Sequence, residues 1–328
     1  MSATTTSPAA MRLPPWLSDR AFVIISRLLA LIILVVVLSL ISPHFLSWNN
    51  LINVFRQASV QFVMAAGLTL VVLAGGIDLS VGAVLGLAGC LAASLINGGD
   101  VALGVLVALS VGLGCGLVNG ALVTLVRIPS FMATYGMLWI AQGLAVIFMK
   151  GDTVYGLTAG FRTIATGFFL GIPIPIWIGL ALMLLLHGIL HTTVLGRSIY
   201  AIGGNPAAAR LSGMPVRFRL IAVYGLSGLL SGFAALVVIA RINSADSSLG
   251  DELLLPAIAA VCLGGTSLFG GVGGIVGTAV GSVILAIILN GMNLLGVQTY
   301  WQSAMTGGII LLSVLADQIG GARLNRQS

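Results

Sequence analysis

Long runs of apolar residues, separated by short polar or glycine-rich segments, recur along almost the whole chain. A helix needs about 20 mostly apolar residues to cross the hydrocarbon core of a bilayer. The first run, residues 21–41, has this length and exceeds a signal-peptide core, so it is predicted to be an uncleaved span. The pattern predicts an all-α integral membrane protein with about ten transmembrane helices. They are expected at 21–41, 58–74, 79–96, 101–126, 130–149, 174–190, 218–240, 256–272, 274–296 and 300–319.

Glycine-rich breaks interrupt several runs, and two of them resemble each other. Residues 73–89 and 263–281 both place Gly-Gly, a polar pair and a glycine-rich helix after an apolar run. An even number of predicted spans separates them, so both would cross the membrane in the same direction, as a parallel internal repeat requires. The alternative is chance similarity between glycine-rich sequences, and the residues alone leave both interpretations open.

The composition is that of a membrane protein. Of 328 residues, 59% are hydrophobic and 7% are charged, against about 25% charged in a soluble domain. The net charge of +6 does not indicate nucleic acid, because the cations sit at the ends of apolar runs rather than along one stripe. We expect a disordered cytoplasmic N-terminus over 1–20, a transmembrane domain over 21–319 and a cytoplasmic C-terminal tail over 320–328.

The distribution of basic residues predicts the orientation. Ten spans put both termini on one side, and a cytoplasmic N-terminus gives that side ten arginines against three arginines and one lysine opposite. The positive-inside rule favours this arrangement. The segment 191–217 then lies in the cytoplasm, and the longest outer loops are 150–173 and 241–253. Those outer loops are either solvated connections or the surface on which an external partner lands.

The segment 191–217, part of a basic interruption that extends to Arg219, is predicted to contain a short helix. Asn205 is a good N-cap, Pro206 fits the first helical position, and Gly213 supplies a stop. About two turns of helix are not stable in water without a partner. This segment is therefore expected to present its helix to another protein.

Few polar side chains fall between or within the apolar runs. Asp78 either lines a substrate path beside a broken helix or, with Ser80, caps the helix beginning near Leu79 close to the cytoplasmic surface, and we favour the cap. The other polar groups are amides, which either bond between helices or together line a passage for a neutral, hydroxyl-rich solute. They are Gln61, Asn119, Gln142, Asn290, Asn293 and Gln302.

No pattern typical of catalysis or of a bound cofactor is present in the sequence. His187 and His191 can share a helix face, but no third ligand is evident, so interfacial histidines are a better interpretation than a metal site. A phosphate-binding loop requires a lysine, and the sole lysine, Lys150, follows Met149. The chain is not expected to be an enzyme or to bind a metal. If ATP powers it, a separate ATPase uses the ATP and Mg.

Four segments resemble the ribose-type permeases of bacterial ABC sugar importers. They are AGGIDLSVGAVLGLAG (74–89), LGRSIYAIGGNPAAARLSG (195–213), AIAAVCLGGTSLFGGVGGIVGT (257–278) and NGMNLLGV (290–297). The resemblance covers about 43–317. It implies a homodimer or pseudo-dimer in the bacterial inner membrane. The implied partners are an ATPase with two nucleotide-binding domains and a periplasmic sugar-binding protein, and the implied mechanism is alternating access.

The resemblance also assigns roles to individual positions. The loop that contacts the ATPase is matched by Gly203, Gly204, Asn205, Ala208, Ala209, Arg210, Leu211, Ser212 and Gly213. Family members often carry Glu after the Asn, where this chain has Pro206, so a capping acid is lost. The family's first glycine motif is matched by Gly75, Gly76, Asp78, Leu79, Ser80 and Gly82. With the amides, we expect a translocation pathway of Gly75, Gly76, Asp78, Ser80, Asn119, Asn290 and Asn293.

Three other classes of function compete with an ATP-driven sugar importer. An ion-coupled secondary carrier of small polar solutes needs titratable groups within the spans, and Asp78 is the strong candidate. A passive channel would conduct without saturation. A membrane-embedded enzyme lacks a catalytic set. Within the importer class, the sugar is left open, because the binding protein selects it.

Overall fold

The structure is a computed structural model that describes residues 19–324. The predicted disorder over 1–20 and the end of the predicted tail fall largely outside this range, although α13 carries helix to Leu324. The helices are α1 (Asp19–Ile41), α2 (Trp48–Leu73), α3 (Val81–Asn97), α4 (Val101–Ala121), the π-helix η1 (Leu122–Val126), α5 (Ser130–Met149), α6 (Ala159–Thr166), α7 (Ile174–Thr192), α8 (Val194–Gly204), α9 (Pro206–Leu211), α10 (Val216–Ile242), α11 (Leu254–Leu263), α12 (Ile275–Leu294) and α13 (Thr299–Leu324).

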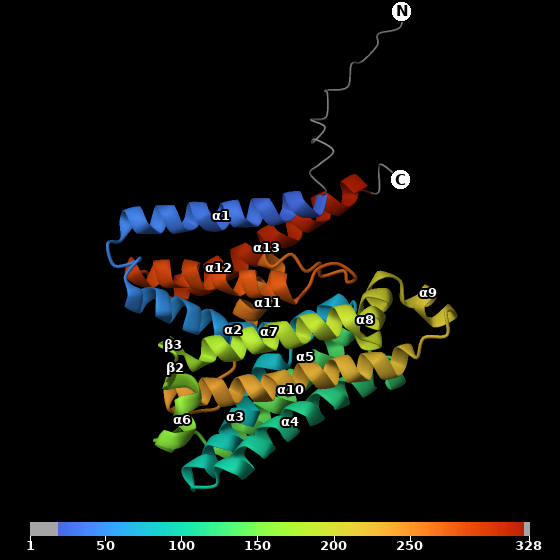
Figure 1. Cartoon of the computed structure of the whole chain (residues 1–328). Coiled ribbons are helices and arrows are strands. Elements are labelled where there is room, and N and C mark those ends of the chain that lie inside the picture. Colours follow the sequence, from blue (N-terminus) through green and yellow to red (C-terminus); the bar gives the residue numbers. More distant parts are fainter. Residues whose placement is uncertain (1–18, 325–328) are drawn as a thin grey trace, which may run out of the picture.

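The long helices run roughly side by side, so the prediction of an all-α membrane protein is confirmed (Figure 1). Six helices of the described range are long and apolar enough to cross a membrane: α2, α4 with η1, α5, α7, α10 and α12. α2 and α10 are mostly buried, whereas fewer than a third of the residues in the apolar stretches of α4, α5 and α7 are buried. The core therefore lies around α2 and α10, and large apolar side chains cover the outside, as lipid contact requires.

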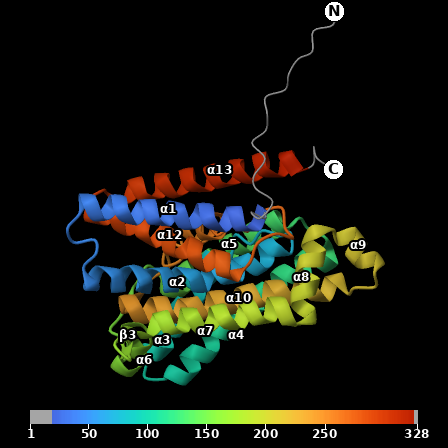
Figure 2. The same ribbon diagram turned by 45° about the horizontal axis from the view of Figure 1, so that its top comes forward.

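The start of α1, the end of α13 and helices α8 and α9 all lie at one end of the bundle (Figures 1 and 2). The opposite end carries α6 and four two-residue strands, β1 (Val154–Tyr155), β2 (Phe168–Phe169), β3 (Ile172–Pro173) and β4 (Ser244–Ala245). The sequence-based orientation likewise groups the two chain ends with the segment 191–217. Which of the two ends faces the cytoplasm stays a prediction.

Glycines allow α4 and α10 to approach each other backbone to backbone. Gly112, Gly116 and Gly120 recur every fourth residue on α4 and face α10, which contributes Gly228 and Gly232. A side chain added at Gly112 would overlap the carbonyl oxygen of Gly228, and one added at Gly228 would overlap that of Gly112. Small residues at this spacing let membrane helices pack closely.

Replacing Gly112 with alanine is expected to destabilise the protein by about 1–3 kcal/mol, because the new methyl group must push two backbones apart. Gly114→Ala is the matched control, since a side chain added there meets nothing within 4 Å. Thermal unfolding of the two purified variants, followed by size-exclusion chromatography, compares them. Equal melting temperatures would contradict the close α4–α10 contact.

The predicted span over 256–272 is wrong in its second half. α11 ends at Leu263, and residues 264–274 form a loop in which Gly265, Gly270, Gly271 and Gly273 have positive φ. Glycine adopts this backbone without steric cost, so these residues end the helix rather than extend it. α11 has ten residues, which makes it about 15 Å long, roughly half of the hydrocarbon core.

Two predicted segments contain further elements that were not predicted. The segment 191–217, expected to hold one short helix, also contains the 11-residue helix α8, whose Thr193 hydroxyl caps it by accepting the Gly196 N–H at 3.2 Å. The predicted outer loop 150–173 contains α6 and three of the four strands.

Candidate functional site: a buried polar cluster and a glycine junction

A buried polar cluster, formed by Asp78, Ser80, Asn119 and Ser227, occupies the break between α2 and α3. One oxygen of Asp78 accepts the Ser80 N–H at 3.0 Å and the Ser80 hydroxyl at 2.6 Å, and the other accepts the Ser227 hydroxyl of α10 at 3.0 Å. The Asn119 amide of α4 donates to Ser80 Oγ at 2.8 Å. All four residues are buried. The cluster therefore joins α3, α4 and α10 to the break.

The favoured interpretation of Asp78 as a cap near the surface is only partly correct. Ser80 occupies the N-cap position of α3, but its side chain makes no capping bond. Asp78 binds the Ser80 N–H instead, and it is 1% exposed. Two side chains of α5 bind the backbone of the break. The Ser130 hydroxyl accepts the Ile77 N–H at 3.3 Å, and the Thr134 hydroxyl accepts the Leu79 N–H at 3.2 Å.

Three segments distant in sequence meet close to this break at a point that we call the glycine junction, made of Gly75, Gly203, Gly270 and Gly271. The Gly271 N–H donates to the Leu73 carbonyl at 2.9 Å. A side chain added at Gly203 would overlap the same carbonyl, and one at Gly270 would lie 2.8 Å from the Cα of Gly75. Only glycine fits at such distances, so the backbones of α2, α8 and the 264–274 loop touch directly.

The two glycine-rich breaks predicted to be related have the same local geometry. Gly75 and Gly265 both have positive φ, and each N–H binds the carbonyl three residues back. The next residues, Gly76 and Thr266, bind carbonyls five residues back. The turn at Gly213 has the same pattern, so this is a common way to end a helix. Internal duplication accordingly stays a prediction.

Helix α9 has the local structure that the sequence predicted. The Asn205 side chain accepts the Ala208 N–H at 3.0 Å, Pro206 begins the helix, and Gly213 follows it with φ of 82°. Ala209 is buried against Ile202, whereas Leu211 is 89% exposed. The Leu211 side chain is therefore free to contact a partner at the end of this short helix.

Helix α8 connects α9 to the glycine junction. Gly203 lies in the last turn of α8, two residues before Asn205, which ends α8 and caps α9. The Tyr200 hydroxyl donates to the Gly273 carbonyl at 3.0 Å, which fixes α8 to the 264–274 loop at a second point. Burial raises the pKa of Tyr200, so this hydroxyl stays protonated and able to donate. Helix α8 therefore contacts both glycine-rich breaks.

The predicted pathway residues do not form one site. Gly75, Gly76, Asp78, Ser80 and Asn119 lie together beyond the end of α2. Asn290 instead forms a reciprocal amide pair with Asn50 in the first turn of α2, at 2.8 and 2.9 Å. Asn293 accepts the Gln302 amide at 2.6 Å. These two asparagines therefore lie at the opposite end of α2 from the Asp78 cluster.

The remaining amides also have partners within the protein. Gln61 donates to the Pro256 carbonyl at 2.9 Å, and Gln142 donates to the Ser247 carbonyl at 3.0 Å. Hydrogen bonds between elements, one of the two interpretations given by the sequence, account for each of them. The rings of His187 and His191 on α7 lie with their centroids 4.0 Å apart and are tilted by 35°. Among the side chains that the structure describes, no three from His, Cys, Asp or Glu gather as metal ligands would.

The two predicted outer loops pair with each other. β1 from the first and β4 from the second are antiparallel, with Val154 opposite Ala245 and Tyr155 opposite Ser244. The Asn243 side chain also accepts the Leu157 N–H at 2.9 Å. Partial burial and the nearby Asp246 and Glu252 carboxylates raise the pKa of Asp251. The second loop therefore concentrates negative charge beside the paired strands.

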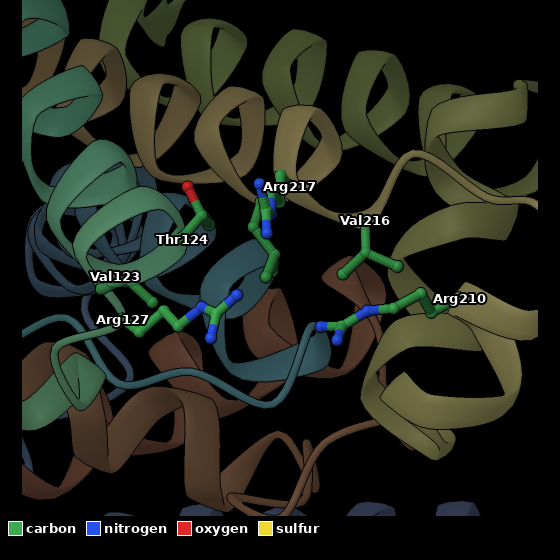
Figure 3. A pocket seen from close by; sticks show the side chains of 7 residues that line it. Val123, Thr124, Arg127, Arg210, Val216 and Arg217 are labelled. Carbon is green, nitrogen blue, oxygen red and sulfur yellow. The ribbon is translucent and has the colours of Figure 1, made fainter.

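A pocket of about 260 Å³ lies between α9 and the adjoining ends of η1 and α10, and three arginines line it (Figure 3). Arg127 follows η1, Arg210 comes from α9, and Arg217 lies in the first turn of α10. The sequence assigned Arg210 to the contact with an ATPase and gave no role to the other two beyond orientation.

Comparisons of the sequence with known proteins show the family to which the chain belongs. Residues 50–314 match the family described as the permease component of the branched-chain amino acid transport system. The ribose import permease protein of Escherichia coli (strain K12) is 43% identical over 322 residues, 97% of this chain and 99% of the relative. That of Bacillus subtilis (strain 168) is 42% identical over 293 residues, 88% and 91% of the two chains.

The D-allose transport system permease protein of Escherichia coli (strain K12) is 37% identical over 292 residues, 88% of this chain and 90% of the relative. No solved structure matches the chain. A family match over most of the chain and relatives above 40% identity over nearly their full length agree with the resemblance drawn from the four motifs. The chain therefore belongs to this family of transport permeases, whose members are membrane-embedded transport subunits rather than enzymes.

Proposed function

We propose that this chain is the transmembrane subunit of an ATP-driven importer for ribose or a related neutral monosaccharide. The observation that carries the proposal is the 43% identity to a ribose import permease over almost the entire length of both chains. A relative named for D-allose supports the sugar class. The comparisons give no support to an ion-coupled carrier.

The proposed assembly pairs two permease copies in the bacterial inner membrane, with both termini of each copy in the cytoplasm. A separate ATPase with two nucleotide-binding domains uses ATP and Mg and docks on α9. A periplasmic sugar-binding protein docks on the loops 150–173 and 241–253. The exposed Leu211 and the paired strands β1 and β4 at the opposite end support these two docking surfaces.

The proposed mechanism is alternating access driven through the glycine junction. Closure of the ATPase displaces α9, and α8 carries this movement to Gly203, which touches both glycine-rich breaks. The breaks are where helix direction can change, because their glycines adopt backbone conformations that other residues avoid. ATP shifts the equilibrium only if the ATPase contacts α9 differently in the two states.

Reconstitution tests the proposal directly. Proteoliposomes that contain the permease, the ATPase and the sugar-binding protein should accumulate labelled ribose or a related sugar only when ATP is present. Leu211→Asp should reduce both co-purification of the ATPase and uptake, because a charge replaces the exposed apolar contact.

Leu170→Asp is the matched control for the coupling surface, since Leu170 is also highly exposed but lies in the β2–β3 turn at the other end. It should leave co-purification of the ATPase unchanged. Uphill uptake by the permease alone, or equal ATPase binding by Leu211→Asp and wild type, would contradict the proposal.

A further inference from the structure

The pocket lined by Arg127, Arg210 and Arg217 has no counter-anion in the described part of the protein. Among the residues whose side chains the structure describes (29 and 31–315), none forms a hydrogen bond or ion pair with any of these three guanidinium groups. The three side chains come from three different elements and converge on one space (Figure 3). Like charges repel, so such a convergence is stable only when an anion or abundant water compensates it.

We propose that this pocket binds the phosphate of an anionic glycerophospholipid. Its walls include Val123, Val216 and Leu220 beside the arginines, so a charged head meets an apolar surface. Leu125 and Val126, the two η1 residues before Arg127, are 59% and 62% exposed. A phospholipid has both parts, a phosphate for the guanidinium groups and acyl chains for the apolar helix face.

The backbone around Arg127 supports a binding role. Arg127 has φ of 69°, a left-handed conformation that costs a non-glycine residue energy, and it ends the π-helix η1. Strained residues and π-helical turns are enriched at binding sites. This conformation carries the chain around the end of η1 and places the Arg127 side chain against the pocket.

A free phosphate and an acidic side chain of the ATPase share the same chemistry as the lipid head. The observations favour lipid, because two of the three arginines belong to the ends of membrane-crossing elements rather than to α9, and the adjoining surface is apolar. This inference does not depend on the transported sugar. It requires only that α4 and α10 lie in a membrane.

Native mass spectrometry of the purified permease, without ATPase, tests the inference with phosphatidylglycerol and phosphatidylcholine as probes. Wild type should retain phosphatidylglycerol preferentially. Each arginine near a membrane surface contributes about a fivefold preference for anionic lipid. The double variant Arg127→Gln, Arg217→Gln should therefore lower that preference by about 30-fold. Arg197→Gln, at the same end but outside the pocket, should change it far less.

Several outcomes would overturn the inference. The first is equal retention of the two lipids by wild type, and the second is equal lipid preference in wild type and the double variant. The third is full displacement of phosphatidylglycerol by millimolar glycerol phosphate, which would show that the acyl chains contribute nothing. If the double variant instead loses only the ATPase in a pull-down and keeps its lipid, the pocket is a protein contact and the lipid assignment is wrong.

Discussion

Replacing Gly203 with alanine is expected to reduce ATP-driven uptake by roughly 5–150-fold, the range that corresponds to 1–3 kcal/mol of coupling free energy. The added methyl group would overlap the Leu73 carbonyl oxygen, which also accepts the Gly271 N–H. Overpacking of this kind costs about 1–3 kcal/mol. Since α2, α8 and the 264–274 loop all meet here, this free-energy cost destabilises most the transport state in which the three backbones are closest together.

Gly204→Ala is the matched control for this substitution. Gly204 is the next residue of α8, yet a side chain added there meets nothing within 4 Å. The melting temperature of Gly204→Ala should equal that of wild type, whereas that of Gly203→Ala should fall. Co-purification of the ATPase should persist in Gly203→Ala, because α9 is untouched. Normal uptake by Gly203→Ala would show that the junction is not required for transport.

Replacing Asp78 with alanine is expected to abolish uptake and to lower the melting temperature. The substitution leaves the Ser80 and Ser227 hydroxyls and the Ser80 N–H without their acceptor inside the protein. Each buried donor left unsatisfied costs about 1–3 kcal/mol. Asp78→Asn should recover most of the melting temperature, because its amide oxygen still accepts from Ser80 and the Ser227 hydroxyl can turn to accept from the amide NH₂.

Asp152→Ala is the control for Asp78→Ala, since Asp152 is an exposed acid in a predicted outer loop. It should leave the melting temperature unchanged. Uptake by Asp78→Asn separates two roles of the buried acid. Recovery of uptake with the melting temperature would assign Asp78 to positioning the α2–α3 break. Recovery of the melting temperature without uptake would show that the negative charge itself is required, contrary to the structural role described above.

The sequence predicted those features that depend on residues near one another in the chain. The start and end of α9 followed from Asn205, Pro206 and Gly213, because a cap, an N1 proline and a positive-φ glycine act locally. The helical character and the approximate position of the long helices followed from apolar runs. The end of α11 at Leu263 was missed, because glycines also occur inside the packed helix α4, so glycine alone does not mark the end of a helix.

Features set by long-range contacts could not be predicted. The glycine junction joins residues near 73, 203 and 270, and only the Gly-Gly pairs at each place hinted at close backbone contact. Helix α8 did carry a local signal that was overlooked. Thr193 is a suitable N-cap, and Ile199 and Ile202 are spaced to share one buried face. The amides of the apolar runs gave no information about their partners, so the separation of Asn290 from Asp78 could not be predicted.

The pairing of β1 with β4 has a consequence for how the two ends of the protein communicate. β4 follows α10 almost directly, and α10 is an unbroken helix of 27 residues, about 40 Å long. Its other end begins five residues after Leu211. A force applied to either outer loop therefore acts on one continuous helix, α10, which begins next to α9. Binding of the sugar-loaded binding protein on the outer loops would then reach α9 through a tilt of α10, without a series of side-chain rearrangements.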